Sequence, residues 1–147
     1  MQPIKEVRFI IIHHSQRDFD FPEFIRFRHK NIRGWEDIGY HYLIGDADNP
    51  HVENGRLYLG RSEKFWGAHA LGFNQNSIGV CFLGNLDNKP PTKEQIKTLV
   101  EFLKCKIKEH NIDVENVLGH FELPEVEKTC PGKFLNMGGI KSMLNSI

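Results

Sequence analysis

Five of the eight histidines stand at the ends of predicted strands or beside unusual residues, where a side chain is well placed for chemistry: His13, His14, His41, His69 and His120. A cysteine, Cys130, follows His120 by ten residues, in an irregular stretch that contains two prolines. Neutral imidazole and thiolate are the ligands that zinc prefers, and three protein ligands leave a fourth position for water or substrate. Lys128 precedes the cysteine by two residues and favours the thiolate over the thiol. These residue types suggest a catalytic zinc site.

The same residues are compatible with a different chemistry, that of a nucleophilic cysteine. Cys130 with His120 or His13 would form a pair in which the imidazole activates the thiol. The two interpretations differ in what inactivates the protein, since alkylation of the thiol stops a cysteine nucleophile and a chelator stops a zinc enzyme. Packing is a third interpretation, because histidine and cysteine are often simply buried. The spacing alone leaves all three open.

Two of the remaining histidines and the other two cysteines receive simpler interpretations. His29 and His110 lie in polar helical patterns, so we expect both to be exposed to water. Cys81 lies in an apolar run and Cys105 in a helical pattern, and both are interpreted as small buried hydrophobic residues. Three cysteines do not make a disulfide framework.

Short apolar runs predict the strands that must position the histidines. Residues 7–12 have the β-branched composition of a buried central strand and lead directly into His13 and His14. Adjacent strand residues point to opposite faces, so these two histidines cannot both face one site. Further strands are expected over residues 40–44, 56–60, 76–84 and 115–120.

Two amphipathic patterns and the tail predict the helices. Thr92 and Gln95 form a capping-box pattern, which is followed by apolar residues at helical spacing: Ile96, Leu99, Val100, Leu103 and Ile107. An earlier helix is expected after Asp20, which we interpret as its N-cap, and a final short helix over residues 138–147. Because strands and helices interleave, the chain is predicted to be an α/β protein with a central sheet flanked by helices.

Length and composition fit one soluble domain and limit the kinds of binding partner that we expect. The chain has 147 residues, and we assign all of them, 1–147, to a single domain with a sizeable core. Nineteen basic residues balance nineteen acidic ones, so the net charge gives no reason to expect nucleic acid or an anionic membrane as partner. No apolar run is long enough to span a bilayer, and the start lacks the features of a signal peptide. We therefore expect synthesis in the cytoplasm without membrane insertion.

Four segments of the chain resemble one enzyme family. In order along the chain they read "IIIHHS", "GWEDIGYHYLI", "GAHALGFNQNSIGVCFLGN" and "LGHFELPEVEKTCPGKF", and they cover roughly residues 9–134. Together they are similar to the zinc-dependent N-acetylmuramoyl-L-alanine amidases, in particular the small phage lysozyme-amidases and the related peptidoglycan recognition proteins. Four blocks with compatible spacing are far more specific than any one of them. The resemblance implies a central mixed β-sheet with flanking helices and a zinc ion at the floor of a groove.

The resemblance also assigns the metal ligands. His13 matches the family's first ligand, the first histidine after the apolar strand, and His120 and Cys130 match the second and third. His14, on the opposite strand face, is then expected to be packed or to support a ligand from behind. Cytosolic relatives that recycle anhydro-muropeptides use aspartate as the third ligand, so Cys130 argues against that branch.

Four further residues receive roles from the same resemblance. Tyr40 and Lys128 match a tyrosine and a lysine of the family, and a phenol and an ammonium would stabilise the oxyanion that develops when water attacks an amide. His69 and Asn76 lie in the block that lines the family's groove, and we expect both to contact substrate. The alternative for Asn76 is a polar turn before the next strand.

The favoured function is zinc-dependent hydrolysis of the amide between N-acetylmuramic acid and L-alanine in peptidoglycan, in the manner of an endolysin. The ligand cysteine together with Tyr40 and Lys128 favours catalysis, because family members that only bind commonly lack the cysteine. The alternatives are a non-catalytic peptidoglycan-binding module and a phage amidase that also regulates an RNA polymerase. We expect a monomer that binds peptidoglycan or muropeptides and reaches the cell wall by holin-type release or dedicated export.

Overall fold

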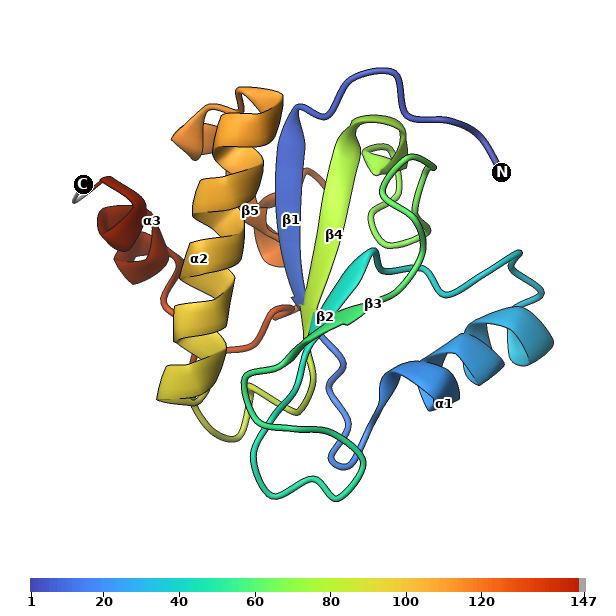
Figure 1. Cartoon of the computed structure of the whole chain (residues 1–147), viewed down its shortest axis with the longest axis vertical. Helices are drawn as coiled ribbons and strands as arrows, with labels where there is room; N and C mark the ends of the chain where they lie inside the picture. Colours follow the sequence, from blue (N-terminus) through green and yellow to red (C-terminus); the bar gives the residue numbers. More distant parts are fainter. Residues whose placement is uncertain (146–147) are drawn as a thin grey trace.

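A five-stranded mixed sheet forms the centre of the computed structural model, which describes residues 1–145 (Figure 1). Its strands are β1 (Phe9–His14), β2 (Tyr42–Ile44), β3 (Leu57–Leu59), β4 (Ser77–Phe82) and β5 (Val117–Gly119). They lie in the order β3-β2-β4-β1-β5. β1 pairs in parallel with β4 and β5, β4 pairs in parallel with β2, and β3 is antiparallel to β2. The predicted α/β class with a central mixed sheet is confirmed.

Two longer helices lie together on one side of the sheet, and a short one lies apart from them (Figure 1). The pair consists of α2 (Lys93–His110) and α3 (Met137–Asn145), and the short helix is α1 (Pro22–Phe27). Single turns complete the structure: η1 (Arg28–Ile32), which is π-helical, and the 3-10 turns η2 (Asn74–Asn76), η3 (Val114–Asn116) and η4 (His120–Glu122). The final two residues of the predicted C-terminal helix, 146 and 147, lie outside the described residues. In residues 1–145, no helix is both long and apolar enough to cross a membrane.

Helix α2 begins and ends where its sequence predicts. The Thr92 side chain accepts a hydrogen bond from the Gln95 N–H, and the Gln95 side chain accepts one from the Thr92 N–H, which completes the capping box. Asn111, in the left-handed conformation, ends the helix. Leu99 and Leu103 are fully buried against the sheet. Cys105, however, is exposed on α2, so its predicted burial is wrong because it lies off the apolar face.

The start of α1 differs from the prediction. Its N-cap is Phe21, with no side-chain cap, and not Asp20. The buried Asp20 carboxylate instead accepts hydrogen bonds from Arg28 Nη1 and Nη2, at 3.0 and 2.7 Å. A bidentate guanidinium is a stronger partner for a buried carboxylate than the helix amides, so the capping role is lost. Gly34, with φ +74°, follows η1 in the left-handed conformation that glycine favours.

Strand β1 separates its two histidines by simple alternation. Ile10 and Ile12 face the core beneath α2, which they share with apolar residues of β4 and α2. Ile11 belongs to a separate cluster on the other face, and His13 follows it by two residues on that same face. The sheet therefore presents His13 on the side away from α2.

The expected exposure of His29 and His110 is wrong. His29 is 9% exposed, and its Nδ1 accepts a hydrogen bond from the Gly39 N–H at 2.9 Å. His110 is half-buried, with its Nε2 3.0 Å from Glu63 Oε2. Each histidine contacts a segment distant in the sequence, His29 at Gly39 and His110 at Glu63. The polar residues around each histidine in the sequence do not reveal such contacts.

Glu63 makes a cluster of contacts that we expect to stabilise the fold. Its carboxylate accepts hydrogen bonds from the Tyr42 hydroxyl and the Lys106 ammonium, and His110 lies beside it. Because these partners are partly buried, we expect Glu63→Gln to lower the free energy of unfolding at neutral pH by about 1–3 kcal/mol, measured by urea denaturation. The matched control is Glu53→Gln, whose exposed pair with Arg56 is worth less than about 0.5 kcal/mol.

The Glu63 contribution should also depend on pH. Burial raises the pKa of this carboxyl, but Lys106, Tyr42 and His110 outweigh burial and leave the pKa below its ordinary value. A lowered folded-state pKa means that the stabilisation is fully present above the ordinary glutamate pKa of about 4.3 and is lost as the pH falls through the folded-state value. The difference between wild type and Glu63→Gln should therefore shrink on acidification. A difference that stays constant into acid would contradict this prediction.

Candidate metal centre and active-site cleft

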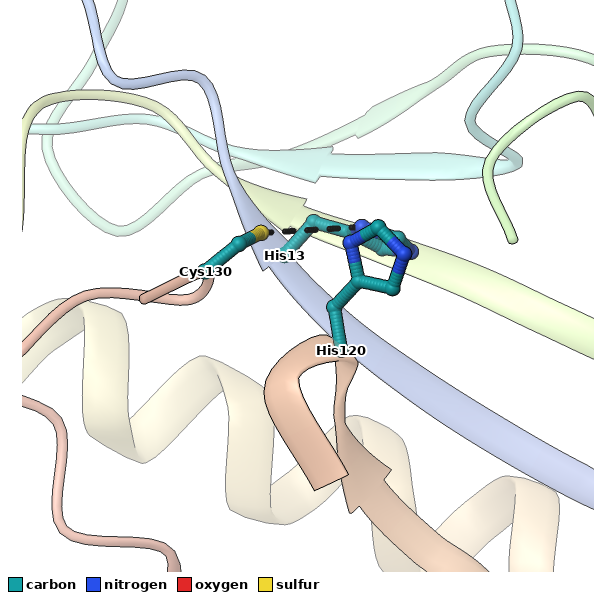
Figure 2. Close-up of side chains that lie close together, drawn as sticks. All are labelled: His13, His120 and Cys130. Carbon is teal, nitrogen blue, oxygen red and sulfur yellow. Dashed lines mark hydrogen bonds between the residues drawn. The ribbon is translucent and has the colours of Figure 1, made fainter. Parts of the chain in front are cut away.

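Three side chains from distant parts of the chain converge on one point (Figure 2). His13 comes from the end of β1, His120 from the first residue of η4 directly after β5, and Cys130 from the loop that follows. Their ligand atoms all lie within 4.8 Å of one another. The parallel pairing of β1 with β5 places the ends of these two strands side by side, which is why the two histidines meet.

The geometry of this cluster fits a zinc ion. Cys130 Sγ lies 3.7 Å from His13 Nδ1. Zinc–nitrogen and zinc–sulfur bonds of ordinary length, meeting at a tetrahedral angle, separate the two ligand atoms by about 3.6 Å. Two imidazoles and one thiolate are also a donor set that zinc accepts, and three protein ligands leave one position open.

The electrostatics keep both imidazoles neutral, as a metal requires. Burial, reinforced by His69 and His120, holds the pKa of His13 well below its ordinary value. Burial and the nearby Lys128 also lower the pKa of His120. Neutral imidazoles present a free lone pair at neutral pH, so no proton has to leave them before a cation binds.

The thiol of Cys130 behaves differently from the sequence expectation. Burial raises its pKa to about 11, against the opposing effects of the His14 N–H and of Lys128. Lys128 thus favours the thiolate, as predicted, but desolvation is the larger effect. Without a metal the group is a protonated thiol at neutral pH, which is a poor nucleophile.

His14 supports the cluster from behind. Its Nδ1 accepts a hydrogen bond from the Leu86 N–H at 3.0 Å, and its own N–H lies 3.4 Å from Cys130 Sγ. The residue is 4% exposed. His14 therefore fixes the loops beside Cys130, in keeping with the expectation of a packed histidine.

A cleft of about 570 Å³ opens over the cluster. Tyr40 and Lys128 both line it, together with all three members of the cluster. The Tyr40 ring centroid lies 5.2 Å from that of His13, and burial, with Cys81 and Cys130 nearby, raises the pKa of the phenol well above its ordinary value. Tyr40 therefore keeps its proton and is able to donate a hydrogen bond. Lys128 is exposed at the rim.

His69 borders the cleft, but its ring nitrogens are already engaged. Nδ1 lies 2.9 Å from His13 Nε2, and Nε2 lies 3.3 Å from Ser77 Oγ. Neither nitrogen is left for the substrate contact that we expected of this residue. Sequence reasoning placed His69 in the correct cleft but could not show that it contacts a neighbouring histidine.

Asn76 lies away from the cleft. It precedes β4 at the end of the sheet where β1 begins, because Phe9 pairs with Ser77, whereas the cluster lies where β1 ends. It lines neither the cleft nor the adjoining hollow of about 490 Å³. Its Oδ1 is buried and makes no hydrogen bond within residues 1–145. The predicted substrate contact is therefore not available, and the alternative of a turn before the strand describes its place.

Residues that received no role in the site from the sequence also line the cleft, among them His29, which was expected at the surface, Arg33 and Trp35. They come from η1 and the turn that follows it. The spacing of four residues between His29 and Arg33, which places both on one helix face, is the signal that could have indicated them.

Comparison with known proteins agrees with this fold. Residues 3–133 match the family model described as N-acetylmuramoyl-L-alanine amidase. The chain therefore belongs to that family, as the resemblance of its four sequence blocks implied. Among solved structures it is similar to the N-acetylmuramoyl-L-alanine amidase LysC from Clostridium intestinale URNW, with a TM-score of 0.83 and 30% identity over 95% of this chain and 86% of that one.

Two animal proteins show the breadth of the similarity. A mouse N-acetylmuramoyl-L-alanine amidase is 34% identical over 109 residues, which is 73% of this chain and 19% of the mouse protein. A point mutant of Drosophila PGRP-LB, solved in complex with tracheal cytotoxin, has a TM-score of 0.76 and 28% identity over 96% of this chain and 84% of that one. The chain spans about half the length of the insect recognition proteins that it matches by sequence.

Proposed function

We propose that this protein is a zinc-dependent amidase that hydrolyses the bond between the lactyl group of N-acetylmuramic acid and the L-alanine of the stem peptide. The observation that carries the proposal is the cluster of His13, His120 and Cys130 beneath a cleft that Tyr40 and Lys128 also line. Membership of the amidase family supports the same reaction class.

Each residue has a physical role in this proposal. His13, His120 and Cys130 would hold the zinc ion, which supplies Lewis acidity toward the amide carbonyl and toward water. Tyr40, kept protonated, donates a hydrogen bond to the oxygen on which negative charge develops. Lys128, at the rim, adds a positive charge that favours the same anionic state and orients acidic groups of the substrate.

The proposed substrate class is peptidoglycan or its soluble muropeptides. The similar Drosophila PGRP-LB mutant has been solved in complex with tracheal cytotoxin, and the cleft here has mainly polar walls. A polar cleft must hydrogen-bond its ligand, and peptides linked to amino sugars supply many partners. We propose that the protein acts as a monomer on a cell wall, as an endolysin does after release through a holin pore or by dedicated export.

A thiol hydrolase is the less favoured chemistry. Its nucleophile would be Cys130, whose pKa of about 11 leaves almost no thiolate at neutral pH. His13 Nδ1 lies 3.7 Å from the sulfur. That distance suits two ligands of one metal better than a hydrogen-bonded pair that transfers a proton.

Mass spectrometry of digested peptidoglycan tests the proposal. We expect free stem peptides with a new L-alanine amino terminus, and we expect this product to disappear with a zinc chelator and return when zinc is added. Cleavage of sugar chains or of peptide cross-links would show that the proposed reaction is wrong. Binding of muropeptides by the zinc-loaded protein without any cleavage would favour a recognition module instead.

A further inference from the structure

A chain of hydrogen bonds leads from the metal cluster into the protein interior. His13 Nε2 lies 2.9 Å from His69 Nδ1, and His69 Nε2 lies 3.3 Å from Ser77 Oγ. Ser77 Oγ in turn lies 2.6 Å from the carbonyl oxygen of Phe73. This chain starts from His13 Nε2, whereas the other ring nitrogen, Nδ1, faces Cys130 Sγ.

The carbonyl at the far end sets the direction of every bond in the chain. A carbonyl oxygen only accepts, so the single hydroxyl proton of Ser77 points to Phe73. The Ser77 oxygen then accepts from His69 Nε2–H, which leaves His69 Nδ1 as an acceptor for His13 Nε2–H. This assignment leaves His13 Nδ1 without a proton, and Nδ1 is the nitrogen that lies 3.7 Å from Cys130 Sγ.

The ring of His69 has almost no freedom to leave this chain. A Cβ atom on Gly79 would come within 2.5 Å of ring atom Cγ, and one on Gly67 within 2.5 Å of Cδ2, so the ring is held between two glycines. Asn74 Oδ1 accepts hydrogen bonds from the N–H groups of His69 and Ala70, both at 3.0 Å. The segment that carries the ring is therefore fixed as firmly as the ring itself.

We propose that His69, oriented by Ser77, is a positioning residue that holds His13 in the tautomer and orientation needed for metal binding. This inference rests on the proposed zinc function. The hydrogen-bond partner of a ligating histidine selects which nitrogen is free for the metal, and loss of such a partner typically lowers metal affinity about 10- to 100-fold. His69 thus acts through His13 and not on the substrate.

Metal affinity measured without substrate tests the inference. We expect His69→Leu to raise the zinc Kd about 10- to 100-fold, measured by competition with a chromophoric chelator, and to alter the Co²⁺ absorption spectrum. His69→Asn keeps an acceptor oxygen near the position of Nδ1 and should recover most of the affinity. Ser77→Ala, which frees the tautomer but keeps the ring, should fall between them. The control His51→Leu changes an exposed histidine and should bind zinc as the wild type does.

The outcomes separate this inference from the function on which it rests. Wild-type zinc affinity and an unchanged Co²⁺ spectrum in His69→Leu would overturn the positioning role and leave the zinc amidase intact. Equal loss in His69→Leu and His69→Asn would also overturn it, because the acceptor would then be irrelevant. A wild-type protein that binds no zinc would overturn both proposals. Melting temperatures, measured for each variant, separate a lost hydrogen bond from a damaged fold.

Discussion

Cys130→Ser should remove zinc from the purified protein and lower amidase turnover by more than about a hundredfold. The thiolate is the one anionic ligand in the cluster, and a serine hydroxyl at neutral pH is neither deprotonated nor a ligand that zinc prefers. Loss of a residue that only hydrogen-bonds to a metal ligand typically lowers metal affinity or activity about 10- to 100-fold. Loss of a direct ligand should lower both by more. Metal content by mass spectrometry and release of stem peptides measure the two effects.

Cys105→Ser is the matched control, because it makes the same change on the exposed surface of α2. We expect unchanged zinc content, turnover and melting temperature in this variant. If Cys130→Ser kept its zinc and lost activity, while the wild type ignored chelators, the metal interpretation would be wrong and Cys130 would be a nucleophile. Alkylation of the wild type with and without zinc completes the comparison, since a coordinated thiolate is protected.

The sequence predicted much of the fold because local patterns decided it. The isoleucine run marked β1 as a central strand, and the structure places β1 between β4 and β5. The capping box at Thr92 and Gln95 fixed the start of α2. Alternation along the strand predicted that His13 and His14 face opposite sides of the sheet, and this prediction did not depend on which residues pack against them. In each case the deciding interaction lies within a few residues along the chain.

The parts that sequence reasoning missed depend on contacts between distant segments. The sequence predicts Asp20 as a helix cap, but in the structure its carboxylate binds Arg28 instead. The sequence predicts His69 as a substrate contact, but the fold places its Nδ1 2.9 Å from Nε2 of His13, which lies 56 residues earlier in the chain. Lys128 indicated a thiolate at Cys130, but the burial that outweighs it is a property of the packed loop. The grouping of His13, His120 and Cys130 came from resemblance to a family, because spacing alone did not require it.

Tyr40→Phe should lower turnover by about 10²- to 10³-fold while zinc content and melting temperature stay near those of the wild type. Removal of one donor to a developing oxyanion typically costs about 2.7–4 kcal/mol in the barrier. The ring of Tyr40 packs against an apolar cluster that includes Leu43 and Cys81, and phenylalanine preserves that packing. Burial keeps the hydroxyl protonated, so its loss removes a donor and no charge. Steady-state kinetics on a defined muropeptide measure the change.

Tyr58→Phe provides the control for this prediction, because it removes a hydroxyl of the same kind outside the cleft. That hydroxyl, on β3, accepts a hydrogen bond from the Glu53 N–H at 2.8 Å, and the residue does not line the cleft. We expect the turnover of Tyr58→Phe to equal that of the wild type.

The effect of Tyr40→Phe should fall on kcat with little change in KM, since the donor acts on charge that appears only in the transition state. A rise in KM with unchanged kcat would instead make Tyr40 a residue that only binds substrate.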